Sequence, residues 1–247
     1  MRLSESSAAY LDGEDFTSNF VFDLHGIGHA QPAAQRSDYL RSLVRGKDIL
    51  DVGFVGHLPL IDMERERGNW LHDILRDSAN YCAGIDIDRE GCAYLTGLGF
   101  SDIFCADIVK EDLPAPLRNR HFDLVVLGET LEHVDDPVAF LTGVHERLAG
   151  IADRLVLTTP NAFRMQNTIT TMRGHELINS DHRYWFSPYT LAKVMWGAGF
   201  REIDISTVWA EQPKRTVKGF IKKTVGRAFP AMRDTLVAES RFERTSY

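Results

Sequence analysis

The sequence is short of several features that define large classes of proteins. Its 247 residues include only three cysteines, Cys82, Cys92 and Cys105, with no Cys-x-x-Cys spacing. A disulfide framework or a cysteine-based zinc site is therefore not expected. No uninterrupted apolar run approaches the ~20 residues of a membrane span, and the polar start of the chain lacks the apolar core of a signal peptide. We expect a cytoplasmic protein.

Two phosphate-binding signatures are also missing. No stretch reads G-x-G-x-x-G, the turn of dinucleotide-binding proteins, and none reads G-x-x-x-x-G-K-[S/T]. A nucleotide triphosphatase is therefore not expected, and a nicotinamide oxidoreductase is disfavoured. The net charge of -7 lacks the basic balance that nucleic-acid binding requires, so nucleic acid is excluded as a partner.

Short apolar runs alternate with amphipathic stretches along most of the chain. Strands are predicted at 48–52, 81–87, 101–108, 122–128 and 154–160, and two alternating strands near the end at 201–209 and 234–242. Helices are predicted between them at 36–46, 69–78, 89–99, 136–150 and 187–200. This alternation predicts an α/β protein with a Rossmann-like, mostly parallel sheet and helices on both faces.

Acidic residues follow four successive predicted strands. Asp51 and Gly53 end the first strand, Asp86 the second and Asp107 the third, and Glu129 follows the fourth. Ligands of such sheets bind at the carboxyl ends of the strands. A carboxylate after the second strand can accept both ribose hydroxyls, and one after the third can accept from an adenine amino group. Together they favour a nucleoside site over simple capping of turns and helices.

Six stretches, taken in the order in which they occur, resemble a known family. They are "DILDVG", "GIDID", "CADI", "FDLVVLGETLEHVDDPVAFL", "LVLTTPN" and "WFSPYTLAKVMWGAGF". The chain resembles class I S-adenosylmethionine-dependent methyltransferases of the ubiquinone-biosynthesis-like group over about residues 36–210 and the last strand. "VGFVGH" and "NWLH" also look like a subgroup of surface-polysaccharide and sugar pathways. The stretch 1–35 is interpreted as an N-terminal extension, and 36–247 as the methyltransferase domain.

The resemblance implies a seven-stranded sheet with a C-terminal antiparallel hairpin and S-adenosyl-L-methionine as cofactor. It implies that Asp51, Gly53 and Gly56 form the loop under the methionine part, and that Asp86 binds the ribose hydroxyls. It also implies that Asp107 and Ile108 face the adenine and that Leu127 and Gly128 line the sulfonium end. Amino methylation of nucleic acid is disfavoured, because the Asn/Asp-Pro-Pro-aromatic stretch is missing after the fourth strand.

The glycine loop departs from the family pattern in two ways. Val55 and His57 replace small residues, and His57 is a further candidate for cofactor contact. The stretch 58–68, "LPLIDMERERG", is an insert that either covers the site as a partial lid or forms a surface loop.

Methyl transfer to a hydroxyl requires alignment of the acceptor and removal of its proton. Glu129, Glu132 and His133 are spaced to share one face of a helical turn, and His133 is the obvious base. The same three residues could instead bind a divalent metal, or serve only structural hydrogen bonds. Asp181 and His182, within the polar and aromatic excursion 161–186, are further catalytic candidates on the acceptor side.

The charge of the chain is uneven. Residues 213–233 contain seven basic and no acidic residues, and their apolar residues recur at helical spacing. Such a helix either lies on an anionic membrane surface, which would make the protein peripheral at the inner membrane, or packs on its own domain.

The sequence thus predicts an O-methyltransferase that acts on a sugar or glycolipid hydroxyl with a histidine base. The alternatives are a metal-dependent enzyme acting on a quinone or other small molecule, and a non-catalytic S-adenosylmethionine-binding module.

Overall fold

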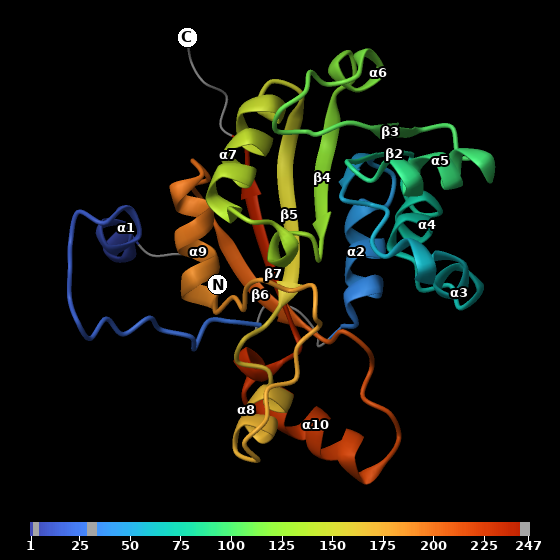
Figure 1. Cartoon of the computed structure of the whole chain (residues 1–247). Helices are drawn as coiled ribbons and strands as arrows, with labels where there is room; N and C mark the ends of the chain where they lie inside the picture. The colour runs from blue at the N-terminus through green and yellow to red at the C-terminus, as the bar shows by residue number, and fades with distance from the viewer. Residues whose placement is uncertain (2–4, 29–33, 243–247) are drawn as a thin grey trace.

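A computed structural model describes residues 1, 5–28 and 34–242 and shows a single mixed sheet at the centre of the molecule (Figure 1). Its seven strands lie in the order β3-β2-β1-β4-β5-β7-β6. Their bounds are β1 Asp48–Val52, β2 Tyr81–Asp86, β3 Ile103–Cys105, β4 Phe122–Gly128, β5 Ala152–Pro160, β6 Asp204–Val208 and β7 Thr235–Arg241. The predicted strands are all present, and β1 and β4 have the predicted bounds.

Six strands run parallel, and β7 lies between β5 and β6 and antiparallel to both. The predicted Rossmann-like fold with its C-terminal antiparallel pair is therefore confirmed. The strand order reverses between β1 and β4, which pair in parallel from Ile49 and Leu124 to Val52 and Leu127. The loops after these two strands diverge, and the crevice between them is where a ligand can enter.

Helices cover both faces of the sheet. Leu141 and Val144 of α7 and Leu191 of α9 pack on one face, while Leu40 of α2 and Leu75 of α4 pack on the other. Apolar residues of both helix pairs are fully buried, as the helical periodicity of the sequence predicts. The longer helices are α2 Arg36–Val44, α5 Arg89–Gly97, α7 Pro137–Leu148, α9 Pro188–Gly197 and α10 Val217–Ala228.

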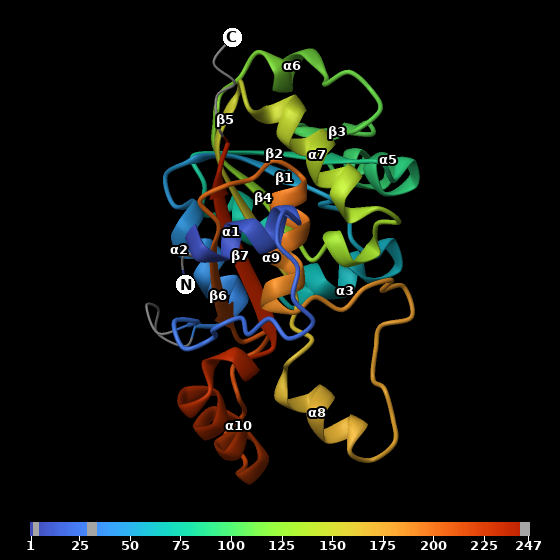
Figure 2. The ribbon, with the colours of Figure 1, turned by 90° about the vertical axis from the view of Figure 1, so that its left-hand side faces the viewer.

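Several short helices complete the chain, and some were not predicted. Helix α4 Leu71–Arg76 was predicted, and η2 Leu131–His133 lies where a helical turn was expected. The unpredicted helices are α1 Glu5–Asp12, η1 Leu58–Leu60, α3 Ile61–Glu66, α6 Ala115–Arg118, α8 Met165–Thr171 and η3 Pro230–Met232. Helix α1 lies over α9 (Figure 2). The ammonium of Met1 donates to Asp204 Oδ1 and to the carbonyl of Ile205, both at 2.6 Å.

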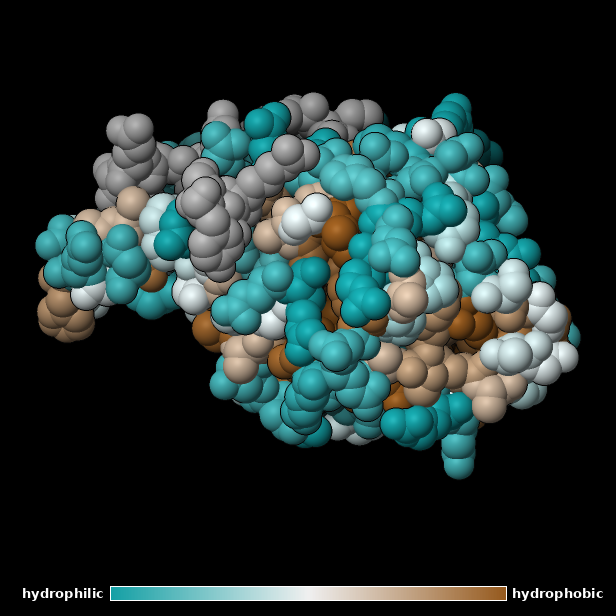
Figure 3. All heavy atoms as spheres, turned by 90° about the horizontal axis from the view of Figure 1, so that it is seen from above, coloured by the Kyte–Doolittle hydropathy of each residue, from teal (hydrophilic) through white to brown (hydrophobic). Residues whose placement is uncertain are grey.

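Helices α8 and α10 project from the same end of the molecule in both ribbon views (Figures 1 and 2). The carboxyl ends of the parallel strands point to this end (Figure 1). The opposite end, seen from above, is mostly hydrophilic with smaller apolar patches between the polar side chains (Figure 3). Among the described residues, no helix combines the length and apolar character needed to cross a membrane.

Candidate active site

A cavity of about 550 Å³ opens at the carboxyl ends of β1 and β4. This volume lies within the range of roughly 300–1,000 Å³ that is usual for small-molecule sites. The cavity contains all four catalytic candidates and most of the expected cofactor residues. The sequence-predicted residues in its lining are Asp51, Gly53, Gly56, His57, Asp86, Gly128, Glu129, His133, Asp181 and His182.

The loop after β1 shows how a chain without a glycine-rich signature can form this wall. Gly53 has φ 77°, a conformation that favours glycine, and a Cβ there would lie 2.6 Å from Thr130 Oγ1. Phe54 and Val55 border the cavity but are buried, at 5% and 1% exposure. A Cβ on Gly84 of β2 would lie 2.7 Å from the Phe54 ring. In the same way, Gly91 of α5 leaves space for Val55. The large residues of the loop are therefore accommodated by glycines in the neighbouring elements β2 and α5.

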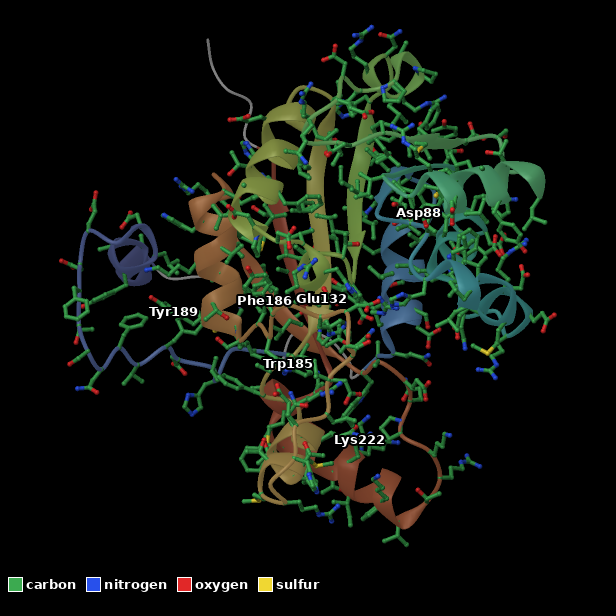
Figure 4. The ribbon with its side chains drawn as sticks, in the orientation of Figure 1. Asp88, Glu132, Trp185, Phe186, Tyr189 and Lys222 are labelled. Atoms are coloured by element: carbon green, nitrogen blue, oxygen red, sulfur yellow. The ribbon has the colours of Figure 1, made fainter. Side chains whose placement is uncertain are left out.

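Asp86 ties this loop to the end of β2. Its Oδ2 accepts from the backbone N–H of Val55 at 2.9 Å, and its Oδ1 accepts from that of Asp88 at 3.0 Å. Burial raises the pKa of Asp86, although these two backbone donors act in the opposite direction. The next acid, Asp88, caps α5 by accepting from the backbone N–H groups of Glu90 and Gly91 (Figure 4). The two neighbouring carboxylates thus have different structural tasks.

Asp51 has a partner that the sequence did not reveal. His72 of α4 places Nδ1 2.9 Å from Asp51 Oδ2, and the two side chains are only 1% and 2% exposed. The pair connects the end of β1 to α4 beneath the cavity. Asp51 and His72 are 21 residues apart in the sequence, and the stretch "NWLH" gives no sign that its histidine pairs with Asp51.

Three of the expected cofactor residues lie outside the lining of this cavity. Ile108 and Leu127 are buried in the core, at 4% and 0% exposure. The Asp107 carboxylate accepts from the backbone N–H groups of Val109 and Lys110 at 2.9 and 3.2 Å. Burial raises the pKa of Asp107, but these donors and the Lys110 ammonium outweigh it, so the pKa is lowered overall. The adenine contact of Asp107 and Ile108 stays a prediction.

The insert 58–68 folds into η1 and α3 and borders the cavity through Leu60, Ile61 and other residues. It is therefore a wall of the cavity, and its role as a partial lid stays a prediction. His57, just before the insert, places Nδ1 3.5 Å from Asp181 Oδ2 of the excursion 161–186. The His57–Asp181 contact joins two opposite walls of the cavity.

A cluster of titratable side chains lies where η2 and the excursion 161–186 border the cavity. One ligand-type atom from each of Glu132, His133 and His182 lies within 4.8 Å of the others. The rings of His133 and His182 meet edge-on with centroids 4.7 Å apart. Figure 4 shows Glu132 near the carboxyl ends of the central strands, above Trp185. His182 thus takes the third position of the expected metal set, in place of Glu129.

Backbone contacts hold this cluster in place. The excursion returns alongside η2, where the N–H of Arg183 donates to the Glu132 carbonyl at 2.8 Å and its Nε to the His133 carbonyl at 3.0 Å. Glu129 precedes η2 with φ 57°, which is uncommon for a residue other than glycine and occurs often at functional sites. Sequence spacing alone could not place His182, because it reaches the cluster only through this return of the chain.

The cluster contains polar atoms with unusual surroundings. The carboxylate of Glu132 is fully buried, and its Oε2 accepts from Thr159 Oγ1 at 3.1 Å. Within the described residues, the buried Oε1 of Glu132 and Nδ1 of His182 have no hydrogen-bond partner. Buried polar atoms of native proteins are rarely left so, and such atoms indicate an unseen water, ion or ligand.

Burial dominates the electrostatics of the same residues. It raises the pKa of Glu132 to about 8, with a further contribution from the Glu129 charge. Burial lowers the pKa of His133 and of His182, and the neighbouring imidazoles add to both effects. Both histidines are therefore neutral at pH 7, in the form that can accept a proton or ligate a cation.

Arg36 is a cavity residue that no motif indicated. Its Nη1 lies 3.6 Å from Glu129 Oε1 and 3.5 Å from Thr158 Oγ1. The guanidinium therefore balances the charge of Glu129 at the cavity wall. Arg36 is the first residue of α2, and only the packing of α2 against the sheet brings it here.

The comparisons with known proteins identify the family of the chain. A family model described as a methyltransferase domain matches residues 29–205. The chain belongs to this family, and it is a class I S-adenosylmethionine-dependent methyltransferase with S-adenosylmethionine as its cofactor. No curated protein sequence matches the chain.

Solved structures show the same fold at low sequence identity. One is from a complex between the Haloferax volcanii Trm112 methyltransferase activator and a methyltransferase. Its sequence identity is 12% and its TM-score 0.52, and the match covers 98% of this chain and 97% of that chain. An S-adenosylmethionine-dependent methyltransferase from Thermotoga maritima has 14% identity and TM-score 0.52, covering 84% and 87%. The [4+2]-cyclase SpnF has 17% identity and TM-score 0.50, covering 89% and 86%. The fold alone therefore does not define the reaction.

Proposed function

We propose that this methyltransferase transfers its methyl group to a hydroxyl oxygen, and that the acceptor is a sugar or glycolipid. The observation that supports an oxygen acceptor is the Glu132–His133–His182 cluster at one end of the cofactor cavity. An alcohol is a weak nucleophile until its proton is removed, and two neutral imidazoles at pH 7 can take that proton. An amine acceptor depends less on such a cluster, because its neutral form is already nucleophilic once its ammonium proton has passed to water or to a base.

The cavity offers a place for each part of the cofactor. Asp86 would accept from the ribose hydroxyls, while Gly53 and Gly56 would let the backbone approach the methionine part. A Cβ on Gly56 would meet no atom within 4 Å, so this side of the loop is open. The cofactor supplies an activated methyl group. The chain positions the acceptor oxygen and accepts its proton, and His133, which lines the cavity, is the proposed base.

The acceptor would lie toward the excursion 161–186. A second cavity of about 480 Å³ lies within this excursion, with Trp185 in its lining. The Trp185 ring is 6.3 Å from that of His182, so the tryptophan stands between the second cavity and the cluster. Its indole N–H donates to Glu176 Oε1 at 2.9 Å and its ring stacks with Arg164. An aromatic face with polar neighbours suits the apolar and hydroxyl faces of a sugar.

A divalent cation is the second candidate for activating the hydroxyl. Glu132, His133 and His182 offer a carboxylate and two imidazoles. The imidazoles suit transition-metal ions and the carboxylate suits Mg²⁺ or Mn²⁺, so Mn²⁺ fits the whole set best. Glu132 Oε1 and His182 Nδ1 are buried and have no hydrogen-bond partner among the described residues. This favours the set with His182 over the expected set with Glu129. A cation held there would lower the pKa of an acceptor hydroxyl.

Two measurements test the proposed function. Calorimetry should detect binding of S-adenosylmethionine and S-adenosylhomocysteine but not of NAD, and failure of both sulfur compounds to bind would overturn it. Methyl-labelled S-adenosylmethionine should then label sugar or glycolipid acceptors, and the product should be an ether that resists mild alkali. His133→Ala should reduce kcat by about 100-fold or more, whereas the exposed control His121→Ala should not. Label that is released by alkali or found on nitrogen would contradict the proposal.

Removal of metal ions with EDTA distinguishes activation of the hydroxyl by a cation from activation by His133 alone. If a cation is held, EDTA should abolish turnover, and Mg²⁺ or Mn²⁺ should restore it. The same ions should raise the Tm of the wild type but not that of Glu132→Gln. If His133 acts alone, EDTA should change neither activity nor Tm.

A further inference from the structure

Helix α10 packs on the protein through a face without apolar side chains. Gly226 faces the indole of Trp209, and any side chain at Gly226 would overlap this ring. Lys222 lies on the same side of the helix, where its ammonium donates to Asp234 Oδ2 at 2.7 Å and sits 5.2 Å from the Trp209 ring. Gly219 is also buried. Gly226, which would weaken an isolated helix, allows this close approach, whereas a Cβ on Gly219 would meet the backbone of Lys214 just before the helix.

The apolar side chains of α10 point the opposite way. Val217, Phe220 and Ile221 are 79%, 71% and 52% exposed, and Phe229, just past the helix, is 61% exposed. The first three recur at i, i+3 and i+4, so they form one stripe on the outer face. The packing on its own domain that the sequence left open therefore occurs through the glycine face, and the apolar stripe stays uncovered.

Basic side chains flank this stripe. From helical geometry, Lys218 lies along one edge of the outer face and Lys223 and Arg227 along the other. Lys214 and Arg215 precede the helix, and all five side chains are exposed. In the described part of the chain, none of the five forms an ion pair with a carboxylate. The remaining sequence is strongly acidic, so this is a localised positive surface.

The surface lies at the active-site end of the molecule. Helices α8 and α10 project together from this end, and Figure 4 shows Lys222 below Trp185 and Glu132. Beside α8, Met172 is 83% exposed, and Ile169 within α8 is 38% exposed. Helix α8 lies within the excursion 161–186, which also carries the second cavity and His182, so apolar side chains are exposed on both projecting helices.

We propose that α10 docks this protein on an anionic lipid bilayer, so that the active site faces an acceptor held in the membrane. An apolar stripe with lysines on both edges is the arrangement of a helix that lies in the headgroup region. A second copy of the chain fits the stripe poorly. Two stripes facing each other around a two-fold axis would bring their basic edges together. The docking rests on α10 alone, and its link to the acceptor rests on the proposed function.

Co-sedimentation of the full chain with vesicles tests the docking. We expect binding to phosphatidylcholine vesicles that contain phosphatidylglycerol, at least tenfold weaker binding to pure phosphatidylcholine, and loss of most binding at 0.5 M salt. Equal binding to both vesicle types, or to neither, would overturn the proposal.

Variants of the stripe and of its edges locate the contact. The double change Phe220→Ser/Ile221→Ser should weaken vesicle binding by more than about 100-fold, since two large apolar side chains no longer enter the bilayer. The change Lys218→Gln/Lys223→Gln/Arg227→Gln should weaken it by roughly 100-fold, about fivefold for each charge.

Matched controls use exposed residues elsewhere. Phe16→Ser/Leu98→Ser removes two apolar side chains that are 92% and 47% exposed, and Arg41→Gln/Arg45→Gln/Arg118→Gln removes three exposed charges. Both controls should bind vesicles as the wild type does, and losses equal to those of the α10 variants would contradict the assignment to α10.

Two further measurements distinguish membrane docking from dimer formation and from loss of cofactor binding. Light scattering should show the same mass for the wild type and for Phe220→Ser/Ile221→Ser without vesicles. A dimer that the stripe change dissociates would assign α10 to a second copy instead and overturn membrane docking. Calorimetric affinity for S-adenosylmethionine should be unchanged in all α10 variants, so failure of docking and failure of the proposed methyl transfer are read separately.

Discussion

The backbone N–H of Val55 donates a hydrogen bond to Oδ2 of Asp86 at 2.9 Å. This bond fixes the loop after β1 to the end of β2, across the point where two walls of the cavity meet. Because Asp86 Oδ1 also accepts from the N–H of Asp88, the carboxylate orients both loops before any ligand arrives. A pre-oriented site loses less entropy on binding than a flexible one.

Asp86→Ala is expected to raise the Kd for S-adenosylmethionine by about 100-fold, because the ribose would lose its acceptor and the Val55 loop its anchor. Asp86→Asn should cost less, about tenfold, because the amide oxygen can still accept. Titration calorimetry measures both, with the exposed Glu90→Ala as the control that should match the wild type. An affinity within twofold of the wild type in Asp86→Ala would remove Asp86 from the ribose site.

Gly53 and Gly56 are expected to respond differently to the same change. Both have positive φ, 77° and 67°, but only Gly53 is also crowded, by the Thr130 side chain. Gly56→Ala should lower the free energy of unfolding by about 1 kcal/mol, and Gly53→Ala by about 2–4 kcal/mol.

Thr130→Ala supplies the control for that difference. It removes the two atoms of Thr130 that lie closest to the added Cβ. Chemical denaturation of Gly53→Ala/Thr130→Ala should therefore show part of the lost stability restored. If the double variant loses as much free energy of unfolding as the two single variants together, or more, crowding by Thr130 is not the cause of the loss.

Glu132 should make the stability of the protein depend on pH. Its pKa is raised from 4.5 to about 8 in the folded state, so folding favours the protonated form. This contribution is fully present below pH 4.5 and is lost as the pH rises to about 8. Glu132→Gln, which cannot ionise, should therefore be more stable than the wild type at pH 9 by about 2–4 kcal/mol, and nearly equal to it at pH 4.5.

Thermal denaturation across this pH range, in EDTA, measures the effect. Glu64→Gln serves as a control from the cavity rim, because its carboxylate is outside the cluster. Wild type and Glu132→Gln curves that stay parallel between pH 4.5 and 9 would contradict the raised pKa.

Most of the fold could be predicted because each strand is a short apolar run between turn residues. The runs at 48–52 and 122–128 became β1 and β4 without a change of bounds. The predicted strand 101–108 was too long. β3 comprises only Ile103–Cys105 and lies at the sheet edge, where it pairs on one side. Edge strands gain fewer ladder hydrogen bonds, so apolar pattern alone overestimates their length.

The site was predictable where a residue stands directly at a strand end, as Asp51 and Asp86 do. It was not predictable where tertiary packing supplies the partner. His72 beneath Asp51, Arg36 beside Glu129 and His182 beside Glu132 come from segments that local spacing does not connect. The insert and the excursion could be recognised as additions, but only the folded chain shows that His57 and Asp181 meet across the cavity.

The apolar periodicity of α10 was visible in the sequence, but its orientation was not. Periodicity places Phe220 and Ile221 on one face, and elementary patterning would direct that face inward. The structure instead turns Gly226 inward, because only a residue without a side chain fits against Trp209. Glycine weakens an isolated helix, but in the folded protein Gly226 is the point of contact between α10 and Trp209.

Gly226→Ala is therefore expected to lower the stability of the protein, although alanine has a higher helix propensity than glycine. In a solvent-exposed helix this change stabilises by about 1 kcal/mol. Here the added methyl group would overlap the indole of Trp209, so the protein should lose about 1–3 kcal/mol and α10 should exchange its amide hydrogens faster. Thr224→Ala, at an exposed position of the same helix, is the matched control and should stabilise by a few tenths of a kcal/mol. A peptide of residues 213–233 should gain helicity from either change. If Gly226→Ala stabilised the whole protein as it does the peptide, α10 would not be packed on Trp209, and the outward direction of its apolar stripe would have to be abandoned.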